Sequence, residues 1–259
     1  MKGDRICLDG NLVPPAEAVE DIDSLLSGNY AYQDIQTFGY SSPYLEEHLR
    51  IAGDALLSIH GRGTLPSAGE LGAALEALLR ENRYPAGSTL VRLYLMPERW
   101  MLSCVQQQLY EEFALWHSRL KAITVQYVAP FASRQCAVSL MCARVADDYA
   151  VRCGAEVAVR SDRDGVLSSS GDRTLVAVRE RIGYLTPTGS GAPEDVYRGI
   201  AESCFRRAGM ALHHEPIAGE GEWDEMMVFG PQGIISLKSL DERMFYNTAA
   251  LKLSLALPK

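Results

Sequence analysis

Hydrophobic and polar positions follow two different periods along the chain, and segments of the two kinds succeed one another in a mixed order. From Leu45 to Ile59 apolar residues recur every three to four positions, which is typical of a helix that packs by one face. Residues 30–36 alternate with a period of two, as a half-buried strand does. The pattern predicts helices at 45–59, 68–82, 140–152, 193–209 and 246–255, and strands at 6–8, 12–13, 30–36, 89–95, 102–109, 122–128, 156–160, 166–167, 174–179, 184–186, 211–215, 225–229 and 234–237.

This order of elements predicts an α/β chain of two domains. The hydrophobic pattern breaks at Ala129–Ser133, so we expect an interdomain connection over residues 128–135. A smaller N-terminal α/β domain then covers residues 1–127, and a larger C-terminal domain with a mixed sheet covers residues 136–259. A length of 259 residues suits two small domains of this kind.

Composition narrows the expected partners to a small molecule or another protein. The net charge of −8 argues against nucleic acid, because binding phosphate backbones needs a clustered basic surface. No apolar run approaches the ~20 residues that span a bilayer, and the first ten residues lack the apolar core of a signal peptide. We therefore expect no membrane contact and a cytoplasmic location. The six cysteines have no zinc-ligand spacing, and in a reducing compartment they are expected to be buried small apolar residues.

Seven short sequences carry a resemblance that covers nearly the whole chain. Ile6–Pro14 is similar to an opening hairpin of the form NG-x-hydrophobic-P, and Tyr44–Leu49 is very close to a helix start of the form F-x-L-E-E-H-L. In order and spacing the seven resemble the class IV aminotransferases, a family that includes branched-chain and D-amino-acid aminotransferases and aminodeoxychorismate lyase. The resemblance implies the two-domain fold-type IV architecture, pyridoxal phosphate as cofactor, and a homodimer whose partner completes a cleft between the domains. The other five sequences are at 27–33, 152–157, 164–167, 184–187 and 223–228.

Pyridoxal phosphate needs an amine, and the position that the family gives to its lysine is not a lysine here. The cofactor acts as an electron sink, and a lysine forms a Schiff base with it and moves the substrate's proton. Counting back by the family's spacing from the helix that ends at Gly154 leads to Cys136. The chain has no lysine between Lys121 and Lys238, so a shift of several residues does not supply one. Both of these lysines are expected to be solvated surface residues.

The resemblance also places the cofactor's other partners, and these differ as well. The acid that would hold the ring nitrogen protonated becomes Ser169, which can hydrogen-bond but carries no charge. The asparagine further along becomes Thr174. The phosphate arginine becomes Ile51, while Arg50 stands one residue earlier, about 100° away around the helix. His48, at the same helix start, is expected to be structural.

Two phosphate-binding segments are altered too. The family's G-I-T-R helix start reads Asp-Val-Tyr-Arg at 195–198, which keeps the arginine, replaces threonine by Tyr197 and adds the negative charge of Asp195. The family's T-G-T loop reads Phe-Gly-Pro at 229–231, where proline removes a hydroxyl and an amide. A helix N-terminus with Arg198 still suits a small anion, so Tyr197 and Arg198 form a candidate anion seat.

Other candidate residues have simpler interpretations. Cys136 could be a nucleophile if the pKa of its thiol were lowered, but no histidine is near in sequence, and a buried inert cysteine is favoured. The serines at 168–170 could bind an anion, and a polar turn explains them equally well. His213 and His214 on one strand would point to opposite faces, so no metal site is expected. Asp162–Gly165 is most simply a turn.

Five altered positions point the same way. We expect a degenerate, non-transaminating chain that keeps the fold for small-ligand binding or for a cofactor-independent role, without pyridoxal phosphate. The alternative is a divergent pyridoxal-phosphate-dependent aminotransferase, of branched-chain or D-amino-acid type, or an aminodeoxychorismate-type lyase, whose lysine lies elsewhere. A third hypothesis is an enzyme that uses Cys136 or Ser169 as its nucleophile.

Overall fold

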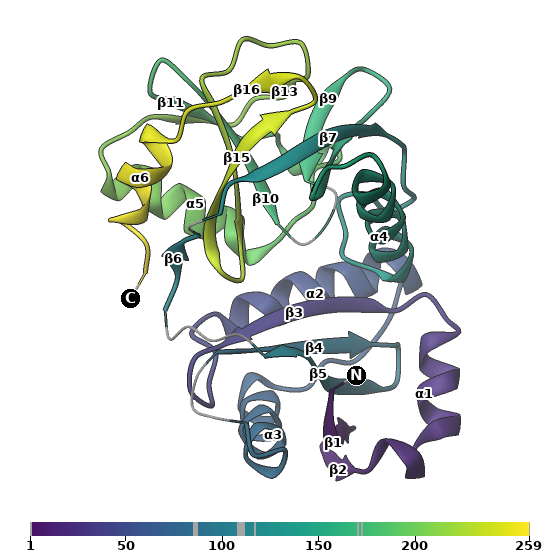
Figure 1. Ribbon diagram of the computed structural model, residues 1–259. Helices are drawn as coiled ribbons and strands as arrows, with labels where there is room; N and C mark the ends of the chain where they lie inside the picture. Colours follow the sequence, from purple (N-terminus) through teal and green to yellow (C-terminus); the bar gives the residue numbers. More distant parts are fainter. Residues whose placement is uncertain are drawn as a thin grey trace. The chain divides into compact units, whose positions relative to one another are not determined.

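The computed structural model describes residues 2–84, 88–107, 112–116, 118–169, 171 and 173–258. The chain forms two compact units, and each is built on its own sheet. The first unit holds residues 1–112 and 134–137, and the second holds residues 113–133 and 138–259. The mixed α/β class expected from the sequence is confirmed, as Figure 1 shows.

The first unit contains a five-stranded antiparallel sheet. Its strands are β1 (Lys2–Leu8), β2 (Asn11–Val13), β3 (Ala31–Thr37), β4 (Thr89–Leu95) and β5 (Trp100–Gln107), and its helices are η1 (Pro15–Glu17), α1 (Val19–Leu26), α2 (Leu45–His60) and α3 (Ala68–Glu81). The strands are ordered β2-β1-β5-β4-β3. Strands β1 and β2 form the expected hairpin, and its turn residues Asp9 and Gly10 have φ angles of 48° and 86°, as a type I′ turn requires.

Local signals fix the ends of the two longer helices. Helix α3 begins with a capping box, in which Glu70 N donates to Ser67 Oγ at 3.2 Å and Ser67 N donates to Glu70 Oε2 at 2.8 Å. Helix α2 ends at Gly61, whose φ of 69° is the left-handed conformation that glycine adopts without a steric penalty. Both helices therefore begin and end close to where the sequence predicts.

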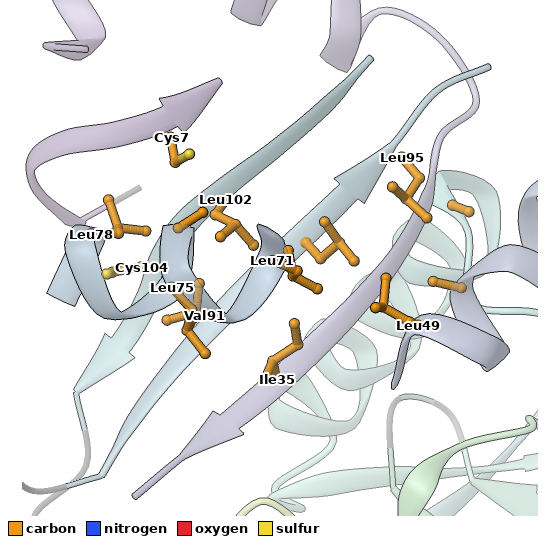
Figure 2. Packing of buried hydrophobic residues seen from close by; sticks show 14 of the residues in the cluster. Cys7, Ile35, Leu49, Leu71, Leu75, Leu78, Val91, Leu95, Leu102 and Cys104 are labelled. Carbon is orange, nitrogen blue, oxygen red and sulfur yellow. The ribbon is translucent and has the colours of Figure 1, made fainter. Parts of the chain in front are cut away.

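One face of this sheet packs against α2 and α3 through aliphatic side chains. Figure 2 shows Leu75 of α3 lying against the strands. Because side chains alternate along a strand, Ile35 and Val91 point into this core while their neighbours Asp34 and Arg92 point to the opposite face. Burying one leucine contributes about 1.5–3 kcal/mol, so this layer holds both helices to the sheet and leaves the other face to polar groups.

The second unit contains one larger mixed sheet. Its strands are β6 (Ala114–Leu115), β7 (Leu120–Gln126), β8 (Val157–Ser161), β9 (Val166–Ser169), β10 (Thr174–Arg179), β11 (Ile182–Tyr184), β12 (Leu212–His213), β13 (Ile217–Ala218), β14 (Glu225–Gly230), β15 (Gly233–Leu240) and β16 (Arg243–Met244), and its helices are α4 (Ala137–Arg152), η2 (Thr188–Ser190), α5 (Val196–Arg207) and α6 (Thr248–Ser254). The order is β12-β11-β10-β14-β15-β7-β8-β9-β13, with β6 and β16 also paired to β15.

Helix α4 connects two parallel neighbours, β7 and β8, and so completes a βαβ unit. It approaches the sheet through small residues, because Ala146 and Ala150 pack against Ala158 with Ile123 and Val125 beside them. No helix in the described ranges has both the length and the apolar character of a membrane span.

The structure differs from the sequence-based expectation in several elements. Helix α1 is not predicted by the pattern, because only Leu25 of its eight residues is buried. Strand β7 lies in the second unit, since it pairs with β8 and β15, whereas the expected bounds of 1–127 and 136–259 assign it to the N-terminal domain. Helix α5 begins at Val196 rather than at Pro193, because Asp195 is its N-cap. Strand β5 begins at Trp100, and residues 108 and 109 of the expected strand lie outside the described residues.

Candidate functional site

Cys136, at the family's lysine position, belongs to a short segment that is hydrogen-bonded along β3. Tyr32 N donates to Gln135 O at 3.0 Å, and Ala137 N donates to Tyr30 O at 2.9 Å. Cys136 lies between these two bonds, and its side chain is fully buried. A thiol with its backbone held on both sides fits an inert buried cysteine better than a nucleophile, which a substrate must reach.

A chain of buried polar side chains secures the same segment. Gln33 Nε2 donates to Gln135 Oε1 at 2.6 Å, and Gln33 Oε1 lies 2.9 Å from His48 Nδ1. The amide oxygen of Gln33 can only accept, so the neutral His48 ring carries its proton on Nδ1. Burial lowers the pKa of His48 to about 3, although the charge of Glu47 acts in the opposite direction. His48 is therefore a neutral structural group, as expected from the sequence.

Lys121 and Lys238 lie in the second unit and both have exposed side chains. Lys121 is in β7, and Lys238 is in the neighbouring strand β15. Their expected surface positions are confirmed.

The serines at the position of the family's acid lie in a strand. Ser168 and Ser169 end β9 and are buried, so their interpretation as a polar turn is wrong, and Ser170 lies outside the described residues. The error arises because three serines resemble a loop in composition, although β9 pairs with β8 throughout. Arg160 of β8 stands opposite Ser168, and its Nε donates to Ser168 Oγ at 2.9 Å. The nearest charge found in this part of the sheet is thus a cation.

The N-terminus of α5 is capped by a carboxylate of the chain itself. Asp195 Oδ1 accepts a hydrogen bond from Arg198 N at 3.0 Å and another from Thr174 Oγ1 at 2.6 Å. Asp195 is only 4% exposed. A helix N-terminus favours a negative charge through its dipole and its unpaired amides. Asp195 already supplies that charge, in the place where a bound anion would use the same amide.

The two residues of the candidate anion seat both adjoin Asp195. Tyr197 is buried. Arg198 Nη1 donates to Thr186 O at 2.9 Å, and burial lowers the pKa of Arg198 while nearby carboxylates act to raise it. The guanidinium is therefore partly engaged by backbone. Pro231 stands in the turn between β14 and β15.

Arg50 and Ile51 face in different directions, as their neighbouring positions on α2 require. Arg50 donates to Glu47 at 2.9 Å and to Asp54 at 2.8 Å on the exposed side of the helix. Ile51 is buried. Surface ion pairs of this kind contribute about 0.3–0.5 kcal/mol each, so Arg50 stabilises the helix surface slightly.

The remaining sequence candidates are structural. His213 and His214 are exposed, and each lies near a different glutamate, at 3.7 and 3.8 Å. Among the described residues no group of three or more metal-ligating side chains comes together. Asp162 Oδ1 accepts from Asp164 N and from Val166 N, both at 2.9 Å, so the expected turn is confirmed.

The cofactor that the resemblance implies does not fit this set of side chains. A Schiff base needs an amine, and Cys136 has none. A phosphate at the N-terminus of α5 would meet the carboxylate of Asp195, which already bonds the available amide. Ser169 offers no charge to a ring nitrogen. We therefore derive no catalytic step that uses the cofactor.

Sequence reasoning missed two buried arginines. Arg92 Nε and Nη2 donate to the two carboxylate oxygens of Asp34, both at 2.5 Å, in a pair that is 4–8% exposed. Arg160 is 5% exposed. Each lies in a strand of mostly apolar residues, and a charged residue inside such a run is the signal that could have found them.

The fold is shared with solved class IV aminotransferase structures. The branched-chain aminotransferase from Thermoproteus uzoniensis, solved with norvaline, matches with a TM-score of 0.83 at 18% identity, over 98% of this chain and 94% of that one. The branched-chain amino acid aminotransferase from T.th., complexed with N-(5'-phosphopyridoxyl)-L-glutamate, matches with a TM-score of 0.82 at 18% identity, over 99% and 93%.

A third match carries another activity in its name. A Legionella pneumophila protein described as a 4-amino-4-deoxychorismate lyase has a TM-score of 0.73 at 14% identity, over 86% of this chain and 88% of that one. No protein-family model matches the sequence, and no curated protein matches it. At these identities the likeness establishes the fold, which is that of fold-type IV pyridoxal-phosphate enzymes, and activity has to be argued from the site.

Proposed function

We propose that this chain keeps the class IV aminotransferase fold without transaminating, and that it binds a small molecule or has another cofactor-independent role. The observation that carries this proposal is Asp195, whose carboxylate caps α5 where the family binds the cofactor's phosphate. The lysine position adds support, because Cys136 is buried and lacks an amine. Binding of a phosphate there would require a second negative charge beside a buried first one, which is unfavourable.

Titration with pyridoxamine 5′-phosphate tests the phosphate position separately from the lysine, because this ligand forms no Schiff base. We expect no binding to the natural chain by calorimetry, and a gain of at least about tenfold in affinity in Asp195→Gly, since phosphate then meets free helix amides. Glycine is tolerated at an N-cap at a cost of a few tenths of a kcal/mol, so the variant should fold. Asp164→Ala, which removes a carboxylate from a turn of the same unit, is the matched control. Micromolar binding to the natural chain would contradict the proposal.

The second candidate function is a divergent pyridoxal-phosphate enzyme, either an aminotransferase for branched-chain or D-amino acids or an aminodeoxychorismate-type lyase. The structural match to an aminotransferase complexed with a phosphopyridoxyl compound favours it. Its lysine would be Lys121 or Lys238, and both are exposed on strands of the second unit. Conversion of leucine, D-alanine or aminodeoxychorismate by the purified protein would support this candidate over the first.

The hypothesis of a Cys136 or Ser169 nucleophile has weaker support. Cys136 is 0% exposed and Ser169 is 8% exposed. A nucleophile must approach the reacting atom within about 3–3.5 Å, so either residue would need local opening of its strand contacts.

We also propose that the protein is a cytoplasmic homodimer. The family resemblance implies the dimer, and six cysteines that form no disulfide in the described part of the chain suit a reducing compartment. Because one chain has a mass of 28.5 kDa, a dimer has a mass of about 57 kDa. Light scattering on the purified protein should give this value at micromolar concentration, and a mass near 28.5 kDa would exclude the dimer.

A further inference from the structure

Two arginines are buried in the middle of strands, and they differ in one respect. Arg92 has the carboxylate of Asp34 as a bidentate partner. Arg160 is buried to a similar degree, but within the described part of the chain no carboxylate forms an ion pair with it. Its Nε donates to Ser168 Oγ and its Nη2 donates to Gly191 O, and both acceptors are neutral.

The pKa values of the two arginines respond accordingly. Burial acts to lower the pKa of Arg92, but the hydrogen bonds and charge of Asp34 outweigh it and raise that pKa above its usual value. Burial lowers the pKa of Arg160, and the weaker influences of Tyr127 and Asp162 do not offset it. Buried charges in proteins are normally paired, because an isolated one loses its hydration without compensation. Arg160 therefore has an unmet need for an anion.

The groups around Arg160 are suited to supply further hydrogen bonds to that anion. Arg160 Nη1 makes no hydrogen bond to any described residue, and the Ser168 hydroxyl, which accepts from Nε, still has its own proton to donate. Burial raises the pKa of Tyr127 to about 12, so the phenol keeps its proton at neutral pH. Asp162 is the nearest acidic influence, and its Oδ1 already accepts two backbone amides.

An apolar pocket adjoins this cation. It has a volume of about 440 Å³, lies between β7 and α4, and is lined by Val125, Tyr127, Cys142 and Val145. Val125 stands opposite Arg160 in the pairing of β7 with β8, and Tyr127 influences the pKa of Arg160. The wall nearest to Arg160 is therefore also a wall of the pocket. A volume of this size is within the ~300–1,000 Å³ of small-molecule sites.

We propose that Arg160 binds the carboxylate of a small organic acid whose aliphatic or aromatic body occupies this pocket. The proposal deepens the small-ligand role proposed above and rests on it. Charge complementarity selects an acid, since Arg160 is a buried cation that lacks a counter-charge. The apolar lining selects a hydrocarbon body, because burial of such a body contributes about 25 cal/mol per Å². All groups involved belong to the second unit.

Hexanoate is the probe for the test, with hexanol and acetate as comparison ligands that lack the charge or the body. Calorimetry on the full chain should show hexanoate binding more tightly than either. Arg160→Met should weaken hexanoate binding at least about tenfold, since a hydrogen-bonded charge contributes about 1.5–3 kcal/mol, and its melting temperature should be unchanged or higher. Cys142→Leu, which fills the pocket, should weaken hexanoate but not acetate. Arg179→Met, at an exposed arginine of the same unit, is the matched control.

Two results would overturn the proposal. One is an absence of hexanoate binding, or equal binding by the natural chain and Arg160→Met. The other is a loss of the dimer in Val145→Asp together with no hexanoate binding, which would assign the apolar face of α4 to a second copy of the chain. Either result leaves the pyridoxamine 5′-phosphate titration unaffected, so the proposed loss of transamination is judged separately.

Discussion

Replacing Asp34 by alanine is expected to lower the free energy of unfolding of the first unit by about 3–5 kcal/mol, the range for removing one partner of a buried ion pair. Asp34 and Arg92 face each other on β3 and β4 and share two hydrogen bonds of 2.5 Å. The guanidinium also lies 4.7 Å from the ring centre of Tyr32. Without Asp34, Arg92 stays buried and charged with no counter-charge. Urea unfolding followed by circular dichroism measures the loss.

Two control variants identify the cause of this loss. Asp9→Ala breaks an ion pair with Arg99 that is about 40% exposed, and it should cost less than about 1 kcal/mol. The double variant Asp34→Leu with Arg92→Met replaces both charges by apolar groups, and it should be more stable than Asp34→Ala, because no buried charge is left unpaired. A loss below about 1 kcal/mol in Asp34→Ala would mean that the pair is solvated in solution.

Acid should destabilise the same unit through His48. Its pKa is about 3 in the fold against 6.5 for an unperturbed histidine, so the unfolded chain binds the extra proton first as pH falls. Stability from this group is therefore complete above about pH 6.5 and declines toward pH 3, by about 1.4 kcal/mol per pH unit. Between pH 6.5 and pH 4.5 the expected loss is about 2.7 kcal/mol. Unfolding free energies across this range measure it.

The comparison with His48→Gln isolates this contribution. Glutamine can still donate to Gln33 Oε1 but does not titrate, so the slope with pH should fall by about one proton's worth. His213→Gln, at an exposed histidine, should leave the slope unchanged. Equal slopes in the natural chain and His48→Gln would show that His48 is solvated.

Periodicity predicted those elements whose local signals agree with their packing. Helices α2 and α3 have an apolar stripe and a recognisable end at Gly61 or start at Ser67, and both were located closely. Helix α1 has one buried residue, so its pattern carries too little information. Strand β7 was located, but its pairing with β15 joins residues more than a hundred positions apart, and no local pattern encodes such a contact.

The candidate site was predictable in its losses and not in their replacements. The resemblance identified Cys136, Ser169 and Asp195 as altered positions from spacing alone. Which groups those residues contact depends on the folded arrangement. The bonds from Thr174 and Arg198 N to Asp195 connect β10 to the start of α5, and the contact of Arg160 with Ser168 depends on the register of β8 against β9. Sequence reasoning could not decide either.

The most direct test of a lost transaminase is reductive trapping. The protein is incubated with one equivalent of pyridoxal phosphate, scanned for a Schiff-base band near ~410–420 nm, reduced with borohydride, and measured by intact mass and peptide mapping. We predict no band and no stoichiometric adduct, with at most scattered traces over the exposed lysines. A band at that wavelength together with a single stoichiometric pyridoxyl adduct at Lys121 or Lys238 would contradict the proposal and establish the divergent enzyme in its place.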